Sequence, residues 1–518
     1  MIRKLTYICF MLLIGISVNA AVVTGRVTCA GEPVAGVSIS DGNIVVQTDA
    51  DGNYSLKSKL ALEYVFMSVP SGYEVHADGI IPRFFKRISP DVKNAVADFE
   101  LVRVDQKKCN IIVYNDIHLV GDKKEKDLEQ ARTGFFPDVI AEYEKLNDVP
   151  VYALTVGDMT SDNKWYTHNY ALPEYLQEMS DFPVPVYHSM GNHDNDMRAG
   201  GGDFNSSSTF RKVVGPNYYS LNIGAYHIIV LDNIFYDNPF DENGIVKSAR
   251  GYHTHLDDMQ FKWLREDLKT VPTDTPIMIV AHAPFTRILG VENEEDVTKD
   301  GFTGGYYAND IVNLFRKFPS VHILTGHTHE NYFAQIDDKV LEHNNIAVSG
   351  ASWKTHSICG LNLIRDGVPG GYSVYTIDGD ELSWYYKAVG FEKDECQFRA
   401  YDMNVVPSSF KGEVAANTIW VNVFNYDPLW KVVVRENGVE IPVKREFLTD
   451  PLYDAAVYDT KLGQGTFKAK PSNHMFTAQT SSPTSEVEII VTDRFGHTYV
   501  EKMERPGYFG LDMKLGNK

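Results

Sequence analysis

The chain has little cysteine and no long apolar run beyond its first residues. Five of its 518 residues are cysteine, and no Cys-x-x-Cys pair occurs, which excludes a redox or structural zinc motif of that kind. No stretch after residue 20 is long and apolar enough to predict a membrane-spanning helix. Internal repeats and low-complexity linkers are also absent. These absences leave a globular chain that is too long for one core, with roughly two to four domains expected.

Positive charge is also scarce. The sequence has 49 Lys and Arg residues against 69 Asp and Glu residues, which gives a formal net charge of −20. This balance argues against a nucleic-acid-binding surface, because such a surface needs basic patches. It also means that the protein as a whole does not attract an anionic substrate, so local cations would have to do so.

The first 20 residues predict a signal peptide. Arg3 and Lys4 precede an apolar run over 5–18, and Ala20 offers a small residue for cleavage. We therefore expect an exported protein (periplasmic, at the outer surface or secreted) with no transmembrane segment after cleavage. An exported protein can form disulfides, so a Cys359–Cys396 bridge and free buried thiols both remain open.

The rest of the sequence divides by its hydrophobic pattern. Residues 21–104 alternate between polar and apolar residues, with turns between them, and predict a small β domain. Strands and helices alternate over 105–350, which is the pattern of an α/β domain. Residues 351–518 predict a C-terminal β-rich domain, with a hairpin extension at 351–404.

Polar side chains follow five predicted strands of the α/β region. The side chains are all carboxylates, amides or imidazoles: Asp116 and His118, Asp158, Asn192 and His193, His282, and His327 and His329. Any one of these motifs could be a turn or a buried core histidine. Together they are different, because the strands of an α/β fold bring such residues to one edge of the sheet.

The chemistry that needs this set is hydrolysis of a phosphoester with two metal ions. Two cations clamp the phosphoryl oxygens and activate a water molecule, and a shared carboxylate offsets the repulsion between the ions. With no cysteine among the ligands, we expect two divalent or trivalent ions of Mn, Fe or Zn. An uncoordinated histidine nearby would protonate the leaving group.

These motifs resemble the calcineurin-like metallophosphoesterases across about 107–350. The resemblance implies that Asp116, His118 and His329 hold one metal. It implies that Asn192, His282 and His327 hold the other, that Asp158 bridges and that His193 is the proton donor.

The family fold implied is a four-layer α/β/β/α sandwich. The arrangement of the chain is similar to exported bacterial members, in which β domains flank that sandwich on both sides. The N-terminal pattern is similar to transthyretin-like or carboxypeptidase-regulatory-like β domains.

Residues near the substrate are less clearly marked. We place Asp194 with His193 in the catalytic pair, as the residue that would orient it, and name Lys354, Tyr166 and His253 as candidate substrate contacts. The predicted function is hydrolysis of phosphate mono- or diesters, with a small-molecule or lipid phosphoester as substrate. The alternative is a surface or glycan-binding protein in which the β domains make the contacts and the phosphoesterase scaffold is vestigial.

Overall fold

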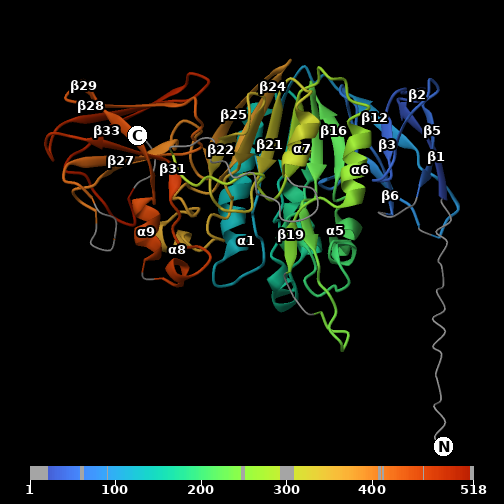
Figure 1. The fold of residues 1–518 in the computed structure, drawn as a ribbon, viewed down its shortest axis with the longest axis horizontal. Helices are drawn as coiled ribbons and strands as arrows, with labels where there is room; N and C mark the ends of the chain where they lie inside the picture. Colours follow the sequence, from blue (N-terminus) through green and yellow to red (C-terminus); the bar gives the residue numbers. More distant parts are fainter. Residues whose placement is uncertain are drawn as a thin grey trace, which may run out of the picture.

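The computed structural model describes residues 21–58, 63–89, 91–246, 251–291, 308–406, 410, 414–458 and 460–513. The predicted signal peptide at 1–20 lies outside these residues. The described chain forms three neighbouring parts, with the N-terminal strands at one end, the α/β region in the middle and the C-terminal strands at the other end (Figure 1).

No helix within the described ranges combines the length and the apolar character needed to cross a membrane.

Two mixed sheets form the centre. The first has five strands in the order β15-β14-β13-β24-β25, and the second has six in the order β16-β17-β20-β21-β23-β22. The strands of the first sheet are β13 (Lys108–Tyr114), β14 (Val151–Thr155), β15 (Val186–His188), β24 (Gly371–Asp378) and β25 (Glu381–Ala388). Those of the second are β16 (Tyr219–Ile223), β17 (Tyr226–Leu231), β20 (Ile277–Ala281), β21 (Val321–Thr325), β22 (Tyr332–Gln335) and β23 (Val340–Asn344).

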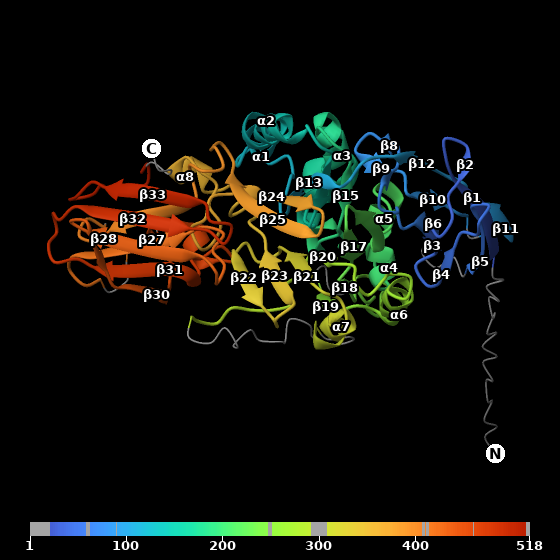
Figure 2. The same cartoon turned by 90° about the horizontal axis from the view of Figure 1, so that it is seen from above.

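The two sheets face one another, and helices lie along them (Figure 2). Tyr375 of the first sheet contacts His343 of the second, with 3.0 Å between the hydroxyl and Nδ1. The helical segment over 127–146 consists of α1 (Asp127–Gln130), a π-helical turn (Ala131–Phe135) and α2 (Phe136–Leu146). The other helices of this region are α3 (Leu172–Glu178), α4 (Asp203–Ser206), α5 (Ser208–Val213), α6 (Asp258–Asp267) and α7 (Ala308–Phe315).

The hairpin of β24 and β25 belongs to the first central sheet. β24 pairs antiparallel with β13 from Lys108↔Asp378 to Val113↔Ser373. We had expected this hairpin, within 351–404, to extend the C-terminal domain. Alternating residues predict a hairpin but do not say which sheet it joins.

The N-terminal strands share one hydrophobic core with the centre. They also cover sheet edges: Val69 bridges Leu221 of β16, and the amide of Val186 in β15 donates to the carbonyl of Ile80. Covering edge strands in this way removes sites for aberrant pairing. The strands are β1 (Ala21–Cys29), β2 (Glu32–Pro33), β3 (Ser38–Ser40), β4 (Val45–Gln47), β5 (Asn53–Ser58), β6 (Tyr64–Met67), β7 (Tyr73–Glu74), β8 (Ala77–Asp78), β9 (Ile81–Pro82), β10 (Phe85–Arg87), β11 (Asn94–Val96) and β12 (Phe99–Arg103).

The C-terminal part contains two four-stranded sheets, ordered β26-β27-β31-β30 and β29-β28-β32-β33. Their strands are β26 (Phe398–Asp402), β27 (Thr418–Val423), β28 (Lys431–Glu436), β29 (Val439–Ile441), β30 (Val443–Leu448), β31 (Ser472–Gln479), β32 (Val487–Thr492) and β33 (Thr498–Met503). Two short helices accompany them, α8 (His356–Cys359) and α9 (Pro451–Val457). Cys359 and Cys396 are both buried as free thiols, and Cys29 and Cys109 are also unbridged.

Candidate metal centre

Every strand end that the sequence singled out lies at the same edge of the two central sheets. Asp116 and His118 follow β13, Asp158 follows β14 and Asn192 follows β15, whereas His282 follows β20 and both His327 and His329 follow β21. Parallel strands have their carboxyl ends at one side of the sheet, which brings together residues as far apart in the chain as Asp116 and His329.

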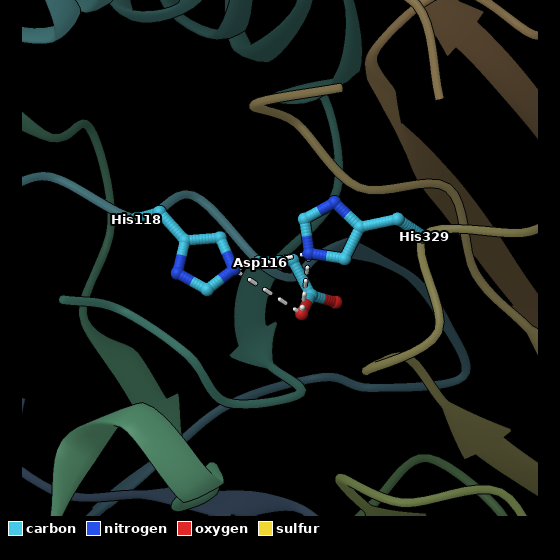
Figure 3. A group of neighbouring side chains, drawn as sticks. All are labelled: Asp116, His118 and His329. Atoms are coloured by element: carbon cyan, nitrogen blue, oxygen red, sulfur yellow. Dashed lines mark hydrogen bonds and ion pairs between the residues drawn. The ribbon is translucent and has the colours of Figure 1, made fainter. Parts of the chain in front are cut away.

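Asp116, His118 and His329 form the first group (Figure 3). Oδ1 of Asp116 lies 3.7 Å from Nε2 of His118 and 3.4 Å from Nε2 of His329. The two Nε2 atoms lie 3.1 Å apart. All three side chains are nearly inaccessible to solvent.

Asp158, His282 and His327 form the second group. Nε2 of His282 is 3.2 Å from Oδ2 of Asp158, 3.1 Å from Oδ1 of Asn192 and 3.2 Å from Nδ1 of His327. Oδ2 of Asp158 is also 3.7 Å from Nε2 of His118 in the first group. Asp158 therefore lies between the two groups.

This donor set fits metal ions. Two ligand atoms about 2.1 Å from one ion, at angles of about 90–110°, lie about 3.0–3.4 Å apart. Most separations within each group are close to that range. In addition, Oδ1 of Asp116 is fully buried without a hydrogen-bond donor. A buried carboxylate oxygen rarely stays without a partner unless a cation satisfies it.

Backbone carbonyls orient three of the imidazoles. Nδ1 of His118 lies 3.0 Å from the carbonyl of Thr160, and Nδ1 of His282 lies 2.8 Å from that of Val156. Nδ1 of His329 contacts the carbonyl of Gly350 at 2.5 Å. An Nδ1 that donates to a carbonyl leaves the Nε2 lone pair facing the cluster, as ligand histidines require.

The imidazoles also control the charge of the buried carboxyls. Burial by itself raises the pKa of Asp158, but His282 and His193 hold it below its usual range. The pKa of Asp116 is likewise lowered by His329 and His118 against the effect of burial. Both carboxyls are therefore ionised near neutral pH and available to a cation.

The backbone around the cluster is unusual. Five of the predicted ligands have positive φ, between 46° and 70°: Asp116, His118, Asp158, His327 and His329. Such angles are uncommon for residues other than glycine and concentrate at functional sites. Gly191 is required for a different reason, since a Cβ there would lie 2.2 Å from Oδ1 of Asp158.

His193 lies beside the cluster with its side chain 19% exposed, and its Nδ1 is 2.6 Å from Oδ1 of Asp162. We had expected Asp194 to orient this imidazole, but Asp162 takes that place. The carboxylate of Asp194 instead accepts the backbone amides of Met159, Thr160 and Gly191. It ties the turn that carries Asn192 to the loop that carries Asp158.

A cavity of about 530 Å³ opens onto the cluster. Its lining includes the predicted contact Lys354, but Tyr166 and His253 are engaged elsewhere. The hydroxyl of Tyr166 donates to Asp196 at 2.7 Å, and Nε2 of His253 lies 2.7 Å from Oδ2 of Asp237. The neighbour of His253, Tyr252 in β19 (Tyr252–Thr254), reaches the cavity instead, because β19 pairs with β18 (Ile234–Tyr236) and alternate residues face opposite sides.

Three family models match successive parts of the chain. "Calcineurin-like phosphoesterase" matches 109–331, "N terminal of Calcineurin-like phosphoesterase" matches 21–104 and "C terminal of Calcineurin-like phosphoesterase" matches 342–499. The chain belongs to the calcineurin-like phosphoesterases. Members of this family hydrolyse phosphoesters with divalent metals, so the resemblance read from the strand-end motifs is confirmed.

Solved structures resemble this calcineurin-like phosphoesterase only distantly. A dimetal phosphatase from Danio rerio is 11% identical, with 54% of this chain and 96% of that chain covered and a TM-score of 0.34. PhoD is 10% identical, with 79% and 84% covered and a TM-score of 0.34. A 5'-nucleotidase from Candida albicans is 13% identical, with 55% and 51% covered and a TM-score of 0.30. No curated protein matches the chain in sequence.

Proposed function

We propose that this chain is an exported phosphoesterase with two metal ions that hydrolyses phosphate mono- or diesters. The observation that carries the proposal is the pair of His/Asp groups joined through Asp158 at the floor of one cavity. The proposed organisation is a four-layer core flanked by an N-terminal β domain at 21–104 and a C-terminal β-rich domain. Pairing of β24 with β13 supports counting 371–388 with the core.

The residues divide into two proposed metal sites. Asp116, His118 and His329 hold one ion, Asn192, His282 and His327 hold the other, and Asp158 is shared. Imidazole, carboxylate and amide ligands suit Mn, Fe or Zn. When bound, such ions polarise the phosphoryl group and lower the pKa of water.

His193 is the proposed general acid, which gives a proton to the leaving-group oxygen. Two features support this role: the ring is partly exposed to the cavity, and Asp162 contacts Nδ1 and so orients the ring. Nε2 is the nitrogen proposed to give the proton. Asp162 is then a positioning residue that fixes the ring. His118, Asp158 and His193 also lie close enough to hold a metal ion, so the proposed role needs a test that separates a donor from a ligand.

The proposed substrate is a small-molecule or lipid phosphoester. The charged start of the chain, the apolar run over 5–18 and Ala20 support export. The β domains remain candidates for contact with glycans or a cell surface.

His193→Ala tests the proposal. We expect the variant to retain the metal content of the wild type, measured by elemental analysis, and to lose about 100-fold or more of its hydrolysis of p-nitrophenyl phosphate or bis-p-nitrophenyl phosphate. His497→Ala, which changes an exposed histidine of the C-terminal part, serves as the control. Loss of metal in His193→Ala would make it a ligand, and a wild type that binds no metal would contradict the proposed enzyme.

A further inference from the structure

The C-terminal part of the chain supplies one wall of the proposed active-site cavity. Thr466 and Phe467 line the cavity together with the metal-site residues. The Phe467 ring lies against His329, with 5.6 Å between ring centroids. Its backbone is fixed by the hydroxyl of Tyr453 in α9, which donates to the Phe467 carbonyl at 2.6 Å. The C-terminal strands adjoin the central sheets on this side (Figure 2).

Phe467 positions a cation inside the cavity. Nζ of Lys354 stands 4.8 Å from the centroid of the Phe467 ring, close enough for a cation–π contact. The sum of this distance and the 5.6 Å between the Phe467 and His329 rings is the upper limit of the separation between the ammonium and the His329 ring centroid. The side chain of Lys354 is half-buried, and burial lowers its pKa.

Among the described residues, no carboxylate forms an ion pair or hydrogen bond with the Lys354 ammonium. The acidic residues that line the cavity outside the metal groups are already engaged. Glu125 pairs with Lys124 at 2.8 Å and Glu330 with Arg365 at 3.2 Å. Asp127 accepts the backbone amides of Val120, Gly121 and Asp122, and Asp122 accepts those of Lys124 and Glu125. Glu125 and Asp122 act on the half-buried Lys354 ammonium only at a distance, and a bound anion would give it a direct counterion.

The scissile phosphoryl group does not account for that anion. Its charge would be met by the two metal ions at the His/Asp groups, as in other two-metal sites. Lys164 lines the same cavity and adds positive charge near Lys354. Burial is the main cause that lowers the pKa of Lys354; Lys164 lowers it further, whereas Glu125 and Asp122 raise it. The cavity therefore holds two lysine side chains outside the metal groups, and Lys354 is the one that lies against an aromatic ring and has no direct carboxylate partner among the described residues.

We propose that Lys354, held against Phe467, binds a second anionic group of the substrate, a phosphate or carboxylate beyond the scissile phosphoryl group. The proposal rests on the proposed function for the position of the scissile group. It makes Lys354 and Phe467 specificity-determining residues contributed by separate parts of the chain. The substrates favoured are phosphoesters with two anionic centres.

Binding of matched ligand pairs tests the proposal without turnover. Each pair compares an alkylphosphonate, whose P–C bond a phosphoesterase does not hydrolyse, with the ω-carboxyalkylphosphonate of the same chain length. The chains have two, three and four carbons, so that the partners differ by one carboxylate. Affinities are measured by calorimetry on the full chain reconstituted with Mn²⁺. In the wild type we expect the carboxylate to strengthen binding about tenfold at the best length.

Variants then locate the effect. Lys354→Met should abolish the preference for the carboxylate and leave alkylphosphonate affinity within about twofold, because that ligand has no second anionic group. Phe467→Leu should reduce the preference, and Phe467→Tyr should retain it. The matched control is Lys393→Met, because Lys393 stands 5.3 Å from the Tyr385 ring and does not line the cavity. Its preference should equal that of the wild type.

Two results would overturn the proposal: no preference at any length in the wild type, or a preference that survives Lys354→Met. A preference that survives Phe467→Leu unchanged would remove Phe467 from its role. If the preference depends on Lys354 but no phosphoester is hydrolysed, the anion site stands and the proposed function fails. If even alkylphosphonates do not bind, both fail.

Discussion

The contact between Asp162 and His193 gives the sharpest test of how the proposed general acid is held. Oδ1 of Asp162 lies 2.6 Å from Nδ1 of His193, and Asp162 is completely buried. Asp162→Asn keeps the shape and an oxygen acceptor but removes the negative charge. Hydrogen bonds to charged groups contribute about 1.5–3 kcal/mol, against about 1 kcal/mol for neutral ones. If Asp162→Asn removes about 1.5 kcal/mol of stabilisation from the oriented, protonated His193 in the transition state, kcat should decrease about tenfold.

The assay is a double-mutant cycle on p-nitrophenyl phosphate or bis-p-nitrophenyl phosphate. Wild type, Asp162→Asn, His193→Ala and the double variant are compared for kcat, KM and bound metal. If Asp162 acts through His193, its substitution should lower kcat about tenfold in the wild type and have no further effect in His193→Ala. KM and metal content should stay within about twofold, because Asp162 would touch neither substrate nor metal.

The control is Asp196→Asn, which changes a carboxylate that accepts the Tyr166 hydroxyl outside the cavity. It should leave kcat unchanged. Two outcomes would refute the reasoning. The first is an unchanged kcat in Asp162→Asn, and the second is the same tenfold loss in the His193→Ala background, which would mean that Asp162 acts independently of the imidazole.

Two further predictions concern the frame of the site. Gly191→Ala should lower metal content and activity and destabilise the fold by about 1–3 kcal/mol, because the added Cβ would lie 2.2 Å from Oδ1 of Asp158. The control is Gly290→Ala, where an added Cβ would meet no other atom within 4 Å. It should behave like the wild type in elemental analysis and thermal unfolding. Burial raises the pKa of Glu342 from 4.5 to about 7 although Phe285, Thr286 and Thr325 donate hydrogen bonds to it, so the folded state holds its proton more tightly. The stability that this proton contributes is complete below about pH 4.5 and is lost as pH rises to 7. The free energy of unfolding of Glu342→Gln, measured by denaturant titration, should therefore rise by up to about 3 kcal/mol relative to wild type over that window. If the unfolding free energies of the two proteins instead change in parallel with pH, the prediction is wrong.

The cluster could be predicted well from the sequence because each ligand motif is a short local pattern at the end of a strand. Each proposed ligand directly follows an apolar strand, and parallel strands ending at one edge place those residues together without further knowledge of the fold. Asp116 and His329 are far apart in the chain, yet the strands β13 and β21 bring their side chains within 3.4 Å. The positive φ angles of these residues could not be seen in the sequence, although they are common where strand ends carry function.

What the sequence could not predict depends on non-local packing. Asp194 is adjacent to His193 and was the natural partner, but the turn at Asn192–Asp194 directs its carboxylate to backbone amides. Asp162 reaches the imidazole from another loop, through the short helical turn at Asp162–Lys164. The residue adjacent in sequence, Asp194, is therefore not the carboxylate that contacts the imidazole. Only the packing of the two loops distinguishes Asp194 from Asp162.

The two flanking parts of the chain also differ in a way that composition does not reveal. The N-terminal strands contact β15 and β16, at sheet edges, and share the central hydrophobic core, so their effect on the site is through stability. The C-terminal part places Phe467 beside His329 and against Lys354, inside the cavity itself. We therefore expect substitutions in that part to alter which phosphoesters bind in the cavity without changing the residues proposed to hold the metals. On the functions proposed here, the chemistry belongs to the strand ends of the centre, whereas substrate choice is shared with a segment that lies far beyond them in the sequence.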